Sequence, residues 1–258
     1  MRYPCALIVL SFALMPVAAQ PPAWVTVKGQ VVLPANVVIP QPAKLDVNEK
    51  ACLAKGPLLD EKIIVNGKNR GLRNVVVWLR PGDPNPAVKF NAKDIHPADA
   101  KRKPADVVID QPCCVFTPRI TLARVGDTIV VKNPAAFAHN FFWASAENGD
   151  LNVTIPANMN YKFQKPLVLE SSAIPYKCTI HPWMQGYVRV FDHPYFALTD
   201  ADGKFEIKNA PAGNYRIVYW HESVGFLGGK AGRAGAPIAI AGGANDTMEM
   251  KPIDFDVK

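Results

Sequence analysis

The chain has 258 residues, a formal net charge of +7 at pH 7 and a hydrophobic share of 49%. This length fits one large domain or two small ones. The charge is spread along the chain and no nucleic-acid-binding motif is present, so we exclude nucleic acid as a partner. Beyond the N-terminus, no segment is apolar over the length that a membrane-spanning helix needs.

The N-terminus has the pattern of a secretory signal peptide. Arg2 precedes a mostly apolar run from Ala6 to Val17, and the small residues Ala18 and Ala19 form a cleavage site. The run is too short to span a bilayer. We therefore expect residues 1–19 to be removed after about Ala19 and the mature chain to be periplasmic or secreted, where thiols can oxidise.

Short β-strands are predicted along the rest of the chain. The 24 prolines and 17 glycines separate runs rich in Val, Ile and Phe, and no convincing amphipathic helix pattern appears. The predicted strands include Val25–Leu33, Val75–Leu79, Thr128–Lys132, Tyr187–Phe191 and Tyr215–Trp220. An all-β sandwich architecture follows.

Four cysteines follow the signal segment, namely Cys52, Cys113, Cys114 and Cys178. An even number in a secreted chain first indicates disulfides. However, adjacent cysteines rarely bond each other, because the vicinal geometry strains the backbone, and Cys178 lies in a run typical of metal chemistry. The alternative is one disulfide from Cys52 to Cys113 or Cys114, with Cys178 kept as a thiolate. Both arrangements stay open, and Cys52–Cys114 is our candidate pair.

Cys178, His181 and Met184 have C-x2-H-x2-M spacing in a loop expected between two strands, and His139 lies upstream. Soft thiolate and thioether ligands favour Cu(I), whereas imidazole suits both Cu(I) and Cu(II). Two histidines and one cysteine in a plane, with a weak axial methionine, form a known electron-transfer site. We therefore predict that these four residues hold one copper ion, which also keeps the thiol deprotonated.

Two other interpretations of these residues compete with copper. In one, Cys178 lies in a disulfide, the two histidines are ordinary polar residues and Met184 fills the core. The other is zinc, which is less favoured because methionine is a poor zinc ligand.

The surroundings of these residues strengthen the copper interpretation, because residues 107–192 resemble the cupredoxins, and amicyanin and plastocyanin in particular. The motifs that carry the resemblance are Val125-Gly126-Asp127-Thr128, His139-Asn140, Cys178–Met184 and Gly186-Tyr187-Val188. The short gap before the methionine is closer to amicyanin. The resemblance implies a Greek-key β-sandwich over 107–193, with His139 as first ligand and Asn140 tying the two ligand loops by hydrogen bonding.

Two residues of the ligand loop have expected roles of their own. Pro182 should stiffen the loop between redox states. Trp183 should lie beside an exposed edge of His181, where it either covers the copper and contacts a redox partner or simply packs over the loop.

The flanking segments follow a different pattern. Its segments are Val27–Val32 and Gly71–Leu79 before the cupredoxin-like region, and Ala197–Ile207 and Pro211–Val218 after it. Joined together, these segments resemble the carboxypeptidase regulatory-like domain, a small transthyretin-like β-sandwich, although the stretch Asn48–Arg70 departs from the pattern. The resemblance implies a discontinuous domain over 24–82 and 194–258, with a linker at 83–106 and the cupredoxin inserted into it or packed on it. Three consecutive pieces without a shared core are the alternative.

Other polar residues of the flanks are expected to be structural. A calcium site at Asp200 and Asp202 is less favoured than a plain turn. His193 and His221 could lie near the copper or a partner, but satisfied structural histidines are the favoured interpretation, and His96 should lie in a loop.

These observations favour an electron carrier for an unidentified redox protein rather than an enzyme. The chain offers no acid/base pair and no Ser/His/Asp set, and its five histidines are too few for an oxygen-reducing copper cluster. The alternative function is an extracytoplasmic binding or structural module whose copper site is a sensor, store or scaffold. A copper enzyme stays open if Met184 does not ligate.

Overall fold

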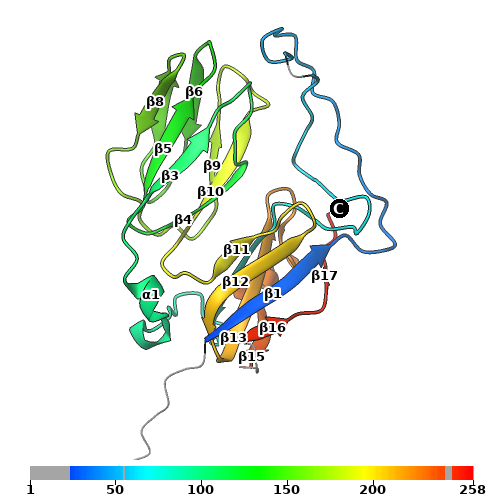
Figure 1. Cartoon of the computed structure of the whole chain (residues 1–258), viewed down its shortest axis with the longest axis vertical. Coiled ribbons are helices and arrows are strands. Elements are labelled where there is room, and N and C mark those ends of the chain that lie inside the picture. Colours follow the sequence, from blue (N-terminus) through cyan, green and yellow to red (C-terminus); the bar gives the residue numbers. More distant parts are fainter. Residues whose placement is uncertain (1–23, 55, 242–245, 258) are drawn as a thin grey trace, which may run out of the picture.

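A computed structural model describes residues 24–54, 56–241 and 246–257. The predicted signal peptide lies outside the described residues. No helix among them is long and apolar enough to cross a membrane. The fold is almost entirely β, as the strand pattern predicted, and its strands form two sandwiches that lie one above the other (Figure 1).

The inner sandwich consists of two sheets from the middle of the chain, with strand orders β4-β10-β9-β6-β7 and β3-β5-β8. Its strands are β3 (Asp106–Asp110), β4 (Ile120–Arg124), β5 (Thr128–Asn133), β6 (His139–Trp143), β7 (Leu151–Ile155), β8 (Met159–Lys162), β9 (Ile174–Lys177) and β10 (Gln185–Phe191). A single core fills the space between the sheets, with Phe141, Trp143 and Tyr176 among its largest side chains.

The outer sandwich combines strands from both ends of the chain. Its strands are β1 (Trp24–Val32), β2 (Val76–Pro81), β11 (Phe196–Leu198), β12 (Lys204–Pro211), β13 (Gly213–His221), β14 (Gly225–Phe226), β15 (Ala236–Ile240), β16 (Thr247–Glu249) and β17 (Ile253–Asp254). β1 pairs with β12, and β2 pairs with β11 and β13. Segments before and after the inner sandwich therefore share both outer sheets, and the inner sandwich interrupts this fold.

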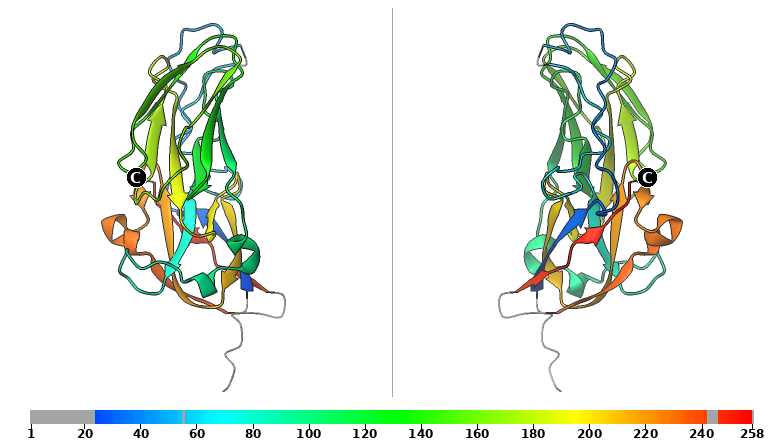
Figure 2. Two further views of the ribbon diagram at one scale, coloured as in Figure 1. Left: turned by 90° about the vertical axis from the view of Figure 1, so that its left-hand side faces the viewer. Right: turned by 90° about the vertical axis from the view of Figure 1, so that its right-hand side faces the viewer.

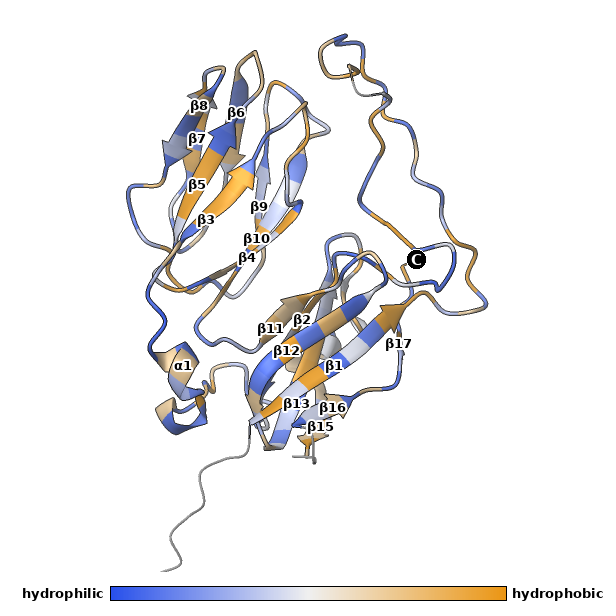
Figure 3. Ribbon diagram, viewed as in Figure 1, coloured by the Kyte–Doolittle hydropathy of each residue, from blue (hydrophilic) through white to orange (hydrophobic). Residues whose placement is uncertain are grey.

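Side-chain alternation explains how the outer strands pack. Along β1, Val25, Val27 and Val31 are buried while intervening residues are partly exposed, and Figure 3 shows the same alternation of hydropathy along β12. Period-two alternation places apolar side chains on one face of each sheet. The described helical turns are short: Ala92–Asp94, α1 (Pro97–Ala100) and Gly229–Ala234.

The two sandwiches meet through a third, smaller core. It contains Trp78 and Trp220 from the outer sandwich and Ile120 and Phe191 from the inner one. The rings of Phe191 and Phe196 stack with centroids 4.3 Å apart.

The long connection between β1 and β2 extends away from the outer sandwich. Figure 1 and Figure 2 show this stretch rising from the outer sandwich to the level of the far end of the inner sandwich. Residues 44–54 and 56–59, which we name the cover segment, place Val47 and Cys52 in the inner core, and Leu45 N–H donates to the Leu58 carbonyl. The first part of the stretch that departed from the outer-domain sequence pattern therefore packs on the inner sandwich, whereas Ile63 and Val65 in its second part pack on the outer core.

Candidate metal centre

The sheet of the inner sandwich brings the predicted ligands together. His139 is the first residue of β6, and Cys178 directly follows β9, which pairs with β6. The loop from Cys178 to Met184 leads into β10, which also pairs with β9. Because β9 lies between β6 and β10, the start of β6 and this loop meet at one end of the sheet.

Three of the four predicted ligands converge there. His139 Nδ1 lies 3.0 Å from His181 Nδ1, and Cys178 Sγ lies 3.7 Å from the same His181 atom. All three donor atoms lie within 4.8 Å of one another, and the three side chains are buried. Two imidazoles and a thiol facing one point form a donor set suited to a soft or borderline metal ion.

Asn140 connects the two ligand-bearing segments. Its backbone N–H donates to Cys178 Sγ at 3.3 Å, and its side-chain Oδ1 accepts from the backbone N–H of Thr179 at 3.2 Å. The first bond fixes the Cys178 sulfur against the start of β6. The second fixes the Cys178 loop against β6.

Met184 closes the ligand loop through backbone hydrogen bonds. Its backbone N–H donates to the His181 carbonyl at 2.9 Å, and its carbonyl accepts from Cys178 N–H at 3.0 Å. The Met184 side chain is 1% exposed and belongs to the same core as Cys178. These two backbone bonds fix the position of Met184 relative to Cys178 and His181.

The buried imidazoles are kept neutral. Burial, assisted by the nearby His181, lowers the pKa of His139 to about 4. Burial also lowers the pKa of His181, against the opposing charge of Glu49. Neutral imidazoles have the lone pair that metal binding needs. His139 Nε2 is buried without a hydrogen-bond partner among the described residues.

A disulfide fixes the cover segment next to this cluster. The structure joins Cys52 to Cys114, and the free cysteines among the described residues are Cys113 and Cys178. The sulfur atoms of Cys52 and Cys114 lie within 4.8 Å of a His181 nitrogen. Because both sulfurs are bonded to each other, they are neighbours of the cluster and not additional ligands.

The expectation of an exposed His181 edge is wrong. His181 is only 4% exposed, because the disulfide and the cover segment lie beside its ring. Trp183 packs at a centroid distance of 5.3 Å from His181, and its Nε1–H donates to the Cys114 carbonyl at 3.1 Å. Trp183 therefore joins the ligand loop to the disulfide, whereas Pro182 is exposed at the surface.

The remaining histidines lie outside the cluster. His193 Nδ1 accepts from Tyr195 N–H, His221 Nδ1 accepts from Ser223 N–H, and His96 Nδ1 accepts from Ala98 N–H at the start of α1. Each thus has a structural hydrogen bond.

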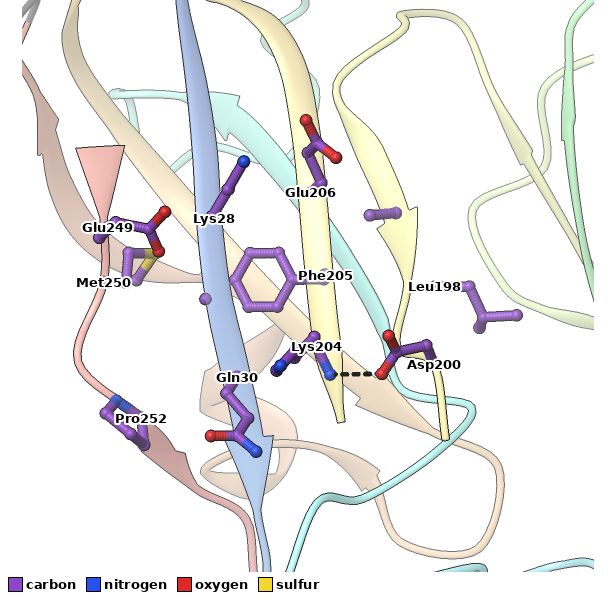
Figure 4. Close-up of a pocket in the computed structure, with 12 residues that line it drawn as sticks. Lys28, Gln30, Leu198, Asp200, Lys204, Phe205, Glu206, Glu249, Met250 and Pro252 are labelled. Atoms are coloured by element: carbon purple, nitrogen blue, oxygen red, sulfur yellow. Dashed lines mark hydrogen bonds between the residues drawn. The ribbon is translucent and has the colours of Figure 1, made fainter. Parts of the chain in front are cut away.

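Asp200 also has a structural role. Its Oδ1 accepts from the backbone N–H groups of Asp202 and Lys204, which closes the turn before β12 (Figure 4). The hollow beside it, of about 800 Å³, is lined by positively and negatively charged side chains, including Lys28, Glu206 and Glu249 (Figure 4). This arrangement is that of a plain turn on an open sheet face.

Sequence reasoning missed two neighbours of the cluster. Phe137 lies with its ring 5.1 Å from that of His139 and 6.0 Å from that of His181. The cover segment was not connected to the ligands either. Its departure from the outer-domain pattern was the signal that it packs elsewhere.

Comparisons with known proteins give a partial likeness. No protein-family model and no curated protein matches the chain. A Cu(I) form of an amicyanin variant is 25% identical over 36% of this chain and 89% of that chain, with a TM-score of 0.30. A second Cu(I) amicyanin variant is 23% identical over 40% and 90%, with a TM-score of 0.30. The Cu-containing nitrite reductase from Thermus scotoductus SA-01 is 20% identical over 35% and 23%, with a TM-score of 0.30.

Proposed function

We propose that the protein is a periplasmic or secreted electron carrier that binds one copper ion through His139, Cys178, His181 and Met184. The observation that carries this proposal is the convergence of two imidazole nitrogens and one thiol sulfur within 4.8 Å at a buried end of a β-sheet. Copper in such a set supplies one-electron chemistry between Cu(I) and Cu(II).

The four proposed ligands fit a copper ion. The Nδ1 atoms of His139 and His181 face each other at 3.0 Å and would both be donors to the ion, which would require their lone pairs to be free. The depressed pKa values of His139 and His181 keep both rings available near neutral pH. The hydrogen bond from Asn140 N–H to Cys178 Sγ fixes the position of the sulfur. Met184, buried in the same core as Cys178, would be the fourth and weakest ligand.

The framework also suits electron transfer. The donors come from one sheet and one short loop closed by the backbone bonds between Cys178, His181 and Met184. Such a loop limits donor movement when the charge of the site changes, which keeps the reorganisation of the protein small. Pro182 restricts the same loop further.

Burial favours a carrier over an enzyme. None of the three clustered side chains is more than 4% exposed, so a substrate has no open path to the donors. An electron, unlike a substrate, does not need direct contact with the site. We propose that it passes through the His181 side of the site, where Trp183 and the disulfide separate the ring from solvent.

The test is the visible spectrum of the full mature chain loaded with one equivalent of Cu(II). We expect an intense absorption band that a mild reductant bleaches and reoxidation restores. The variant Cys178→Ser should lose the band, whereas Cys113→Ser, which removes the other free thiol, should keep it. His139→Gln should also lose it, with His96→Gln as control.

Met184 is tested separately by the reduction potential. Met184→Gln should keep a coloured site but shift its potential, because the axial ligand tunes that quantity. Met159→Leu, at an exposed position, should leave the potential unchanged. A colourless copper complex, or a band that survives Cys178→Ser, would refute the proposal and leave the alternative of a structural module.

A further inference from the structure

A second polar site lies between the two sandwiches, away from the ligand loop. A cavity of about 430 Å³ opens where β2 of the outer sandwich faces β10 of the inner one. Its lining includes Arg80 and Arg189, with Arg233 at the margin and the rings of Trp78 and Phe191 on the wall.

The two arginines are placed there by strand alternation. In β10, Val188 and Val190 fill the inner core, so Arg189 lies on the opposite face with Phe191. In β2, Val77 and Leu79 fill the outer core, so Arg80 lies on the opposite face with Trp78. Each sandwich therefore presents one arginine on the face that it turns toward the other.

Both arginines are buried and incompletely partnered. Arg80 is 8% exposed and Arg189 is 9% exposed. Arg80 Nη2 and Arg189 Nε are buried without a hydrogen-bond partner, and no carboxylate of the described residues forms an ion pair with either arginine. A buried charge without a partner is costly, so this arrangement indicates a missing anion.

The surroundings hold the two guanidinium groups in place. The Arg189 guanidinium lies over the Trp78 ring, 4.7 Å from its centroid. Arg80 Nη1 donates to the carbonyls of Arg233 and Ala234, at 3.0 and 3.1 Å, which leaves Nη2 free. Burial and the charge of Arg233 lower the pKa of Arg189 to about 10. Fixed donors and an excess of nearby positive charge both favour an anion.

The acidic residues of the cavity are engaged elsewhere or lie at its margin. Asp192 pairs with Lys89 at 3.2 Å. Glu170 accepts from Ser145 Oγ, Ala146 N–H and Asn148 Nδ2. Glu147 is exposed. His193 also lines the cavity, and burial lowers its pKa to about 4, so it is neutral near pH 7.

We propose that this cavity binds an oxoanion of the phosphate class between Arg80 and Arg189. A cavity larger than a bare phosphate, with aromatic walls, favours a phosphate ester that carries an apolar group. The site lies outside the proposed copper ligands, so binding is independent of the proposed copper function.

The experiment compares thermal unfolding of the full mature chain with inorganic phosphate, phenyl phosphate or benzoate at about 10 mM, each against chloride at matched ionic strength. We expect phosphate to raise Tm by about 3 °C, because a ligand of the folded state stabilises it. A larger rise with phenyl phosphate would identify an ester as the preferred ligand; an equal rise would identify the free ion. A rise with benzoate alone would refute the phosphate class.

Arginine variants test whether the stabilisation by phosphate arises in this cavity. Arg189→Gln and Arg80→Gln should each weaken phosphate binding about tenfold or more, whereas Arg73→Gln, at an exposed position, should not change it. Arg189→Met should raise Tm in chloride, since it removes an unpartnered buried charge, and should abolish the phosphate response. No response to either phosphate compound, or an equal response in the arginine variants, would overturn the proposal. The copper spectrum, recorded in parallel, should be unchanged in all of these variants.

Discussion

Asp127 shows how one carboxylate organises a turn of the inner sandwich. It accepts two bonds from the Arg102 guanidinium, at 2.8 and 2.9 Å, and one each from the N–H groups of Ala105 and Arg124, both at 2.9 Å. Burial alone would raise the pKa of Asp127, but the Arg102 bonds and the two backbone donors outweigh it and hold the pKa below its ordinary value. The charged form is therefore the one that the fold stabilises.

We predict that Asp127→Asn lowers the free energy of unfolding by about 2 kcal/mol at pH 7, because it removes a charged acceptor of several hydrogen bonds. A folded-state pKa below 3.8 means that Asp127 stabilises the fold fully above that pH, and that this contribution is lost as the pH falls through the folded pKa. Urea unfolding at several pH values should show the two proteins converging in acid. Asp106→Asn, which removes an exposed pair with Lys162, should cost less than about 1 kcal/mol. Equal costs for both variants would contradict this account.

At the scale of elements, the Cys52–Cys114 disulfide holds the cover segment on the ligand end of the inner sandwich. We predict that the double variant Cys52→Ser/Cys114→Ser loses about 4 kcal/mol of stability, since the bond closes a loop with a sequence separation of 62. Its proposed copper site should also be reduced faster by an external reductant, because His181 becomes more exposed. Urea unfolding and stopped-flow bleaching measure the two effects. The control Cys113→Ser should change neither, and a double variant with unchanged bleaching would show that the cover does not limit access.

The sequence predicted elements better than it predicted their mutual contacts. β1 and β5 were predictable because alternation of apolar and polar residues is a local property, and β13 because a β-branched and aromatic run follows a turn. The proximity of Cys178 and His181 was predictable, because the two residues lie close together in the sequence of one loop. The burial of His181 was not, because it depends on the cover segment, which belongs to a distant part of the chain. The site at Arg80 and Arg189 was also hidden, since nothing local shows that two strands from different sandwiches will face each other.

At the scale of the whole molecule, a buried ion pair joins the two sandwiches. Arg119, just before β4, contacts Glu222, just after β13, through two bonds of 2.5 and 2.7 Å. The Arg119 side chain is 11% exposed and that of Glu222 is 2% exposed. Burial alone would lower the pKa of Arg119, but the bond to Glu222 and its charge raise it above the ordinary value.

We predict that Glu222→Gln destabilises the protein by about 3 kcal/mol, because it leaves the buried Arg119 charge without a partner. Arg119→Met/Glu222→Met should recover most of this loss, since neither charge then remains. A double-mutant cycle from urea unfolding measures the coupling. Additive single effects would show that the pair does not couple the sandwiches.

The sheet topology also has a kinetic consequence. Gln30 Nε2 donates to the Asp202 carbonyl across 172 residues, and the β1–β12 pairing spans a comparable distance in the chain. The strands of the inner sandwich pair within residues 106–191. Closing long loops slows folding, and domains generally fold as units. We therefore expect the inner sandwich to fold while β1 and β2 still lack partners, and the outer sandwich to assemble after it.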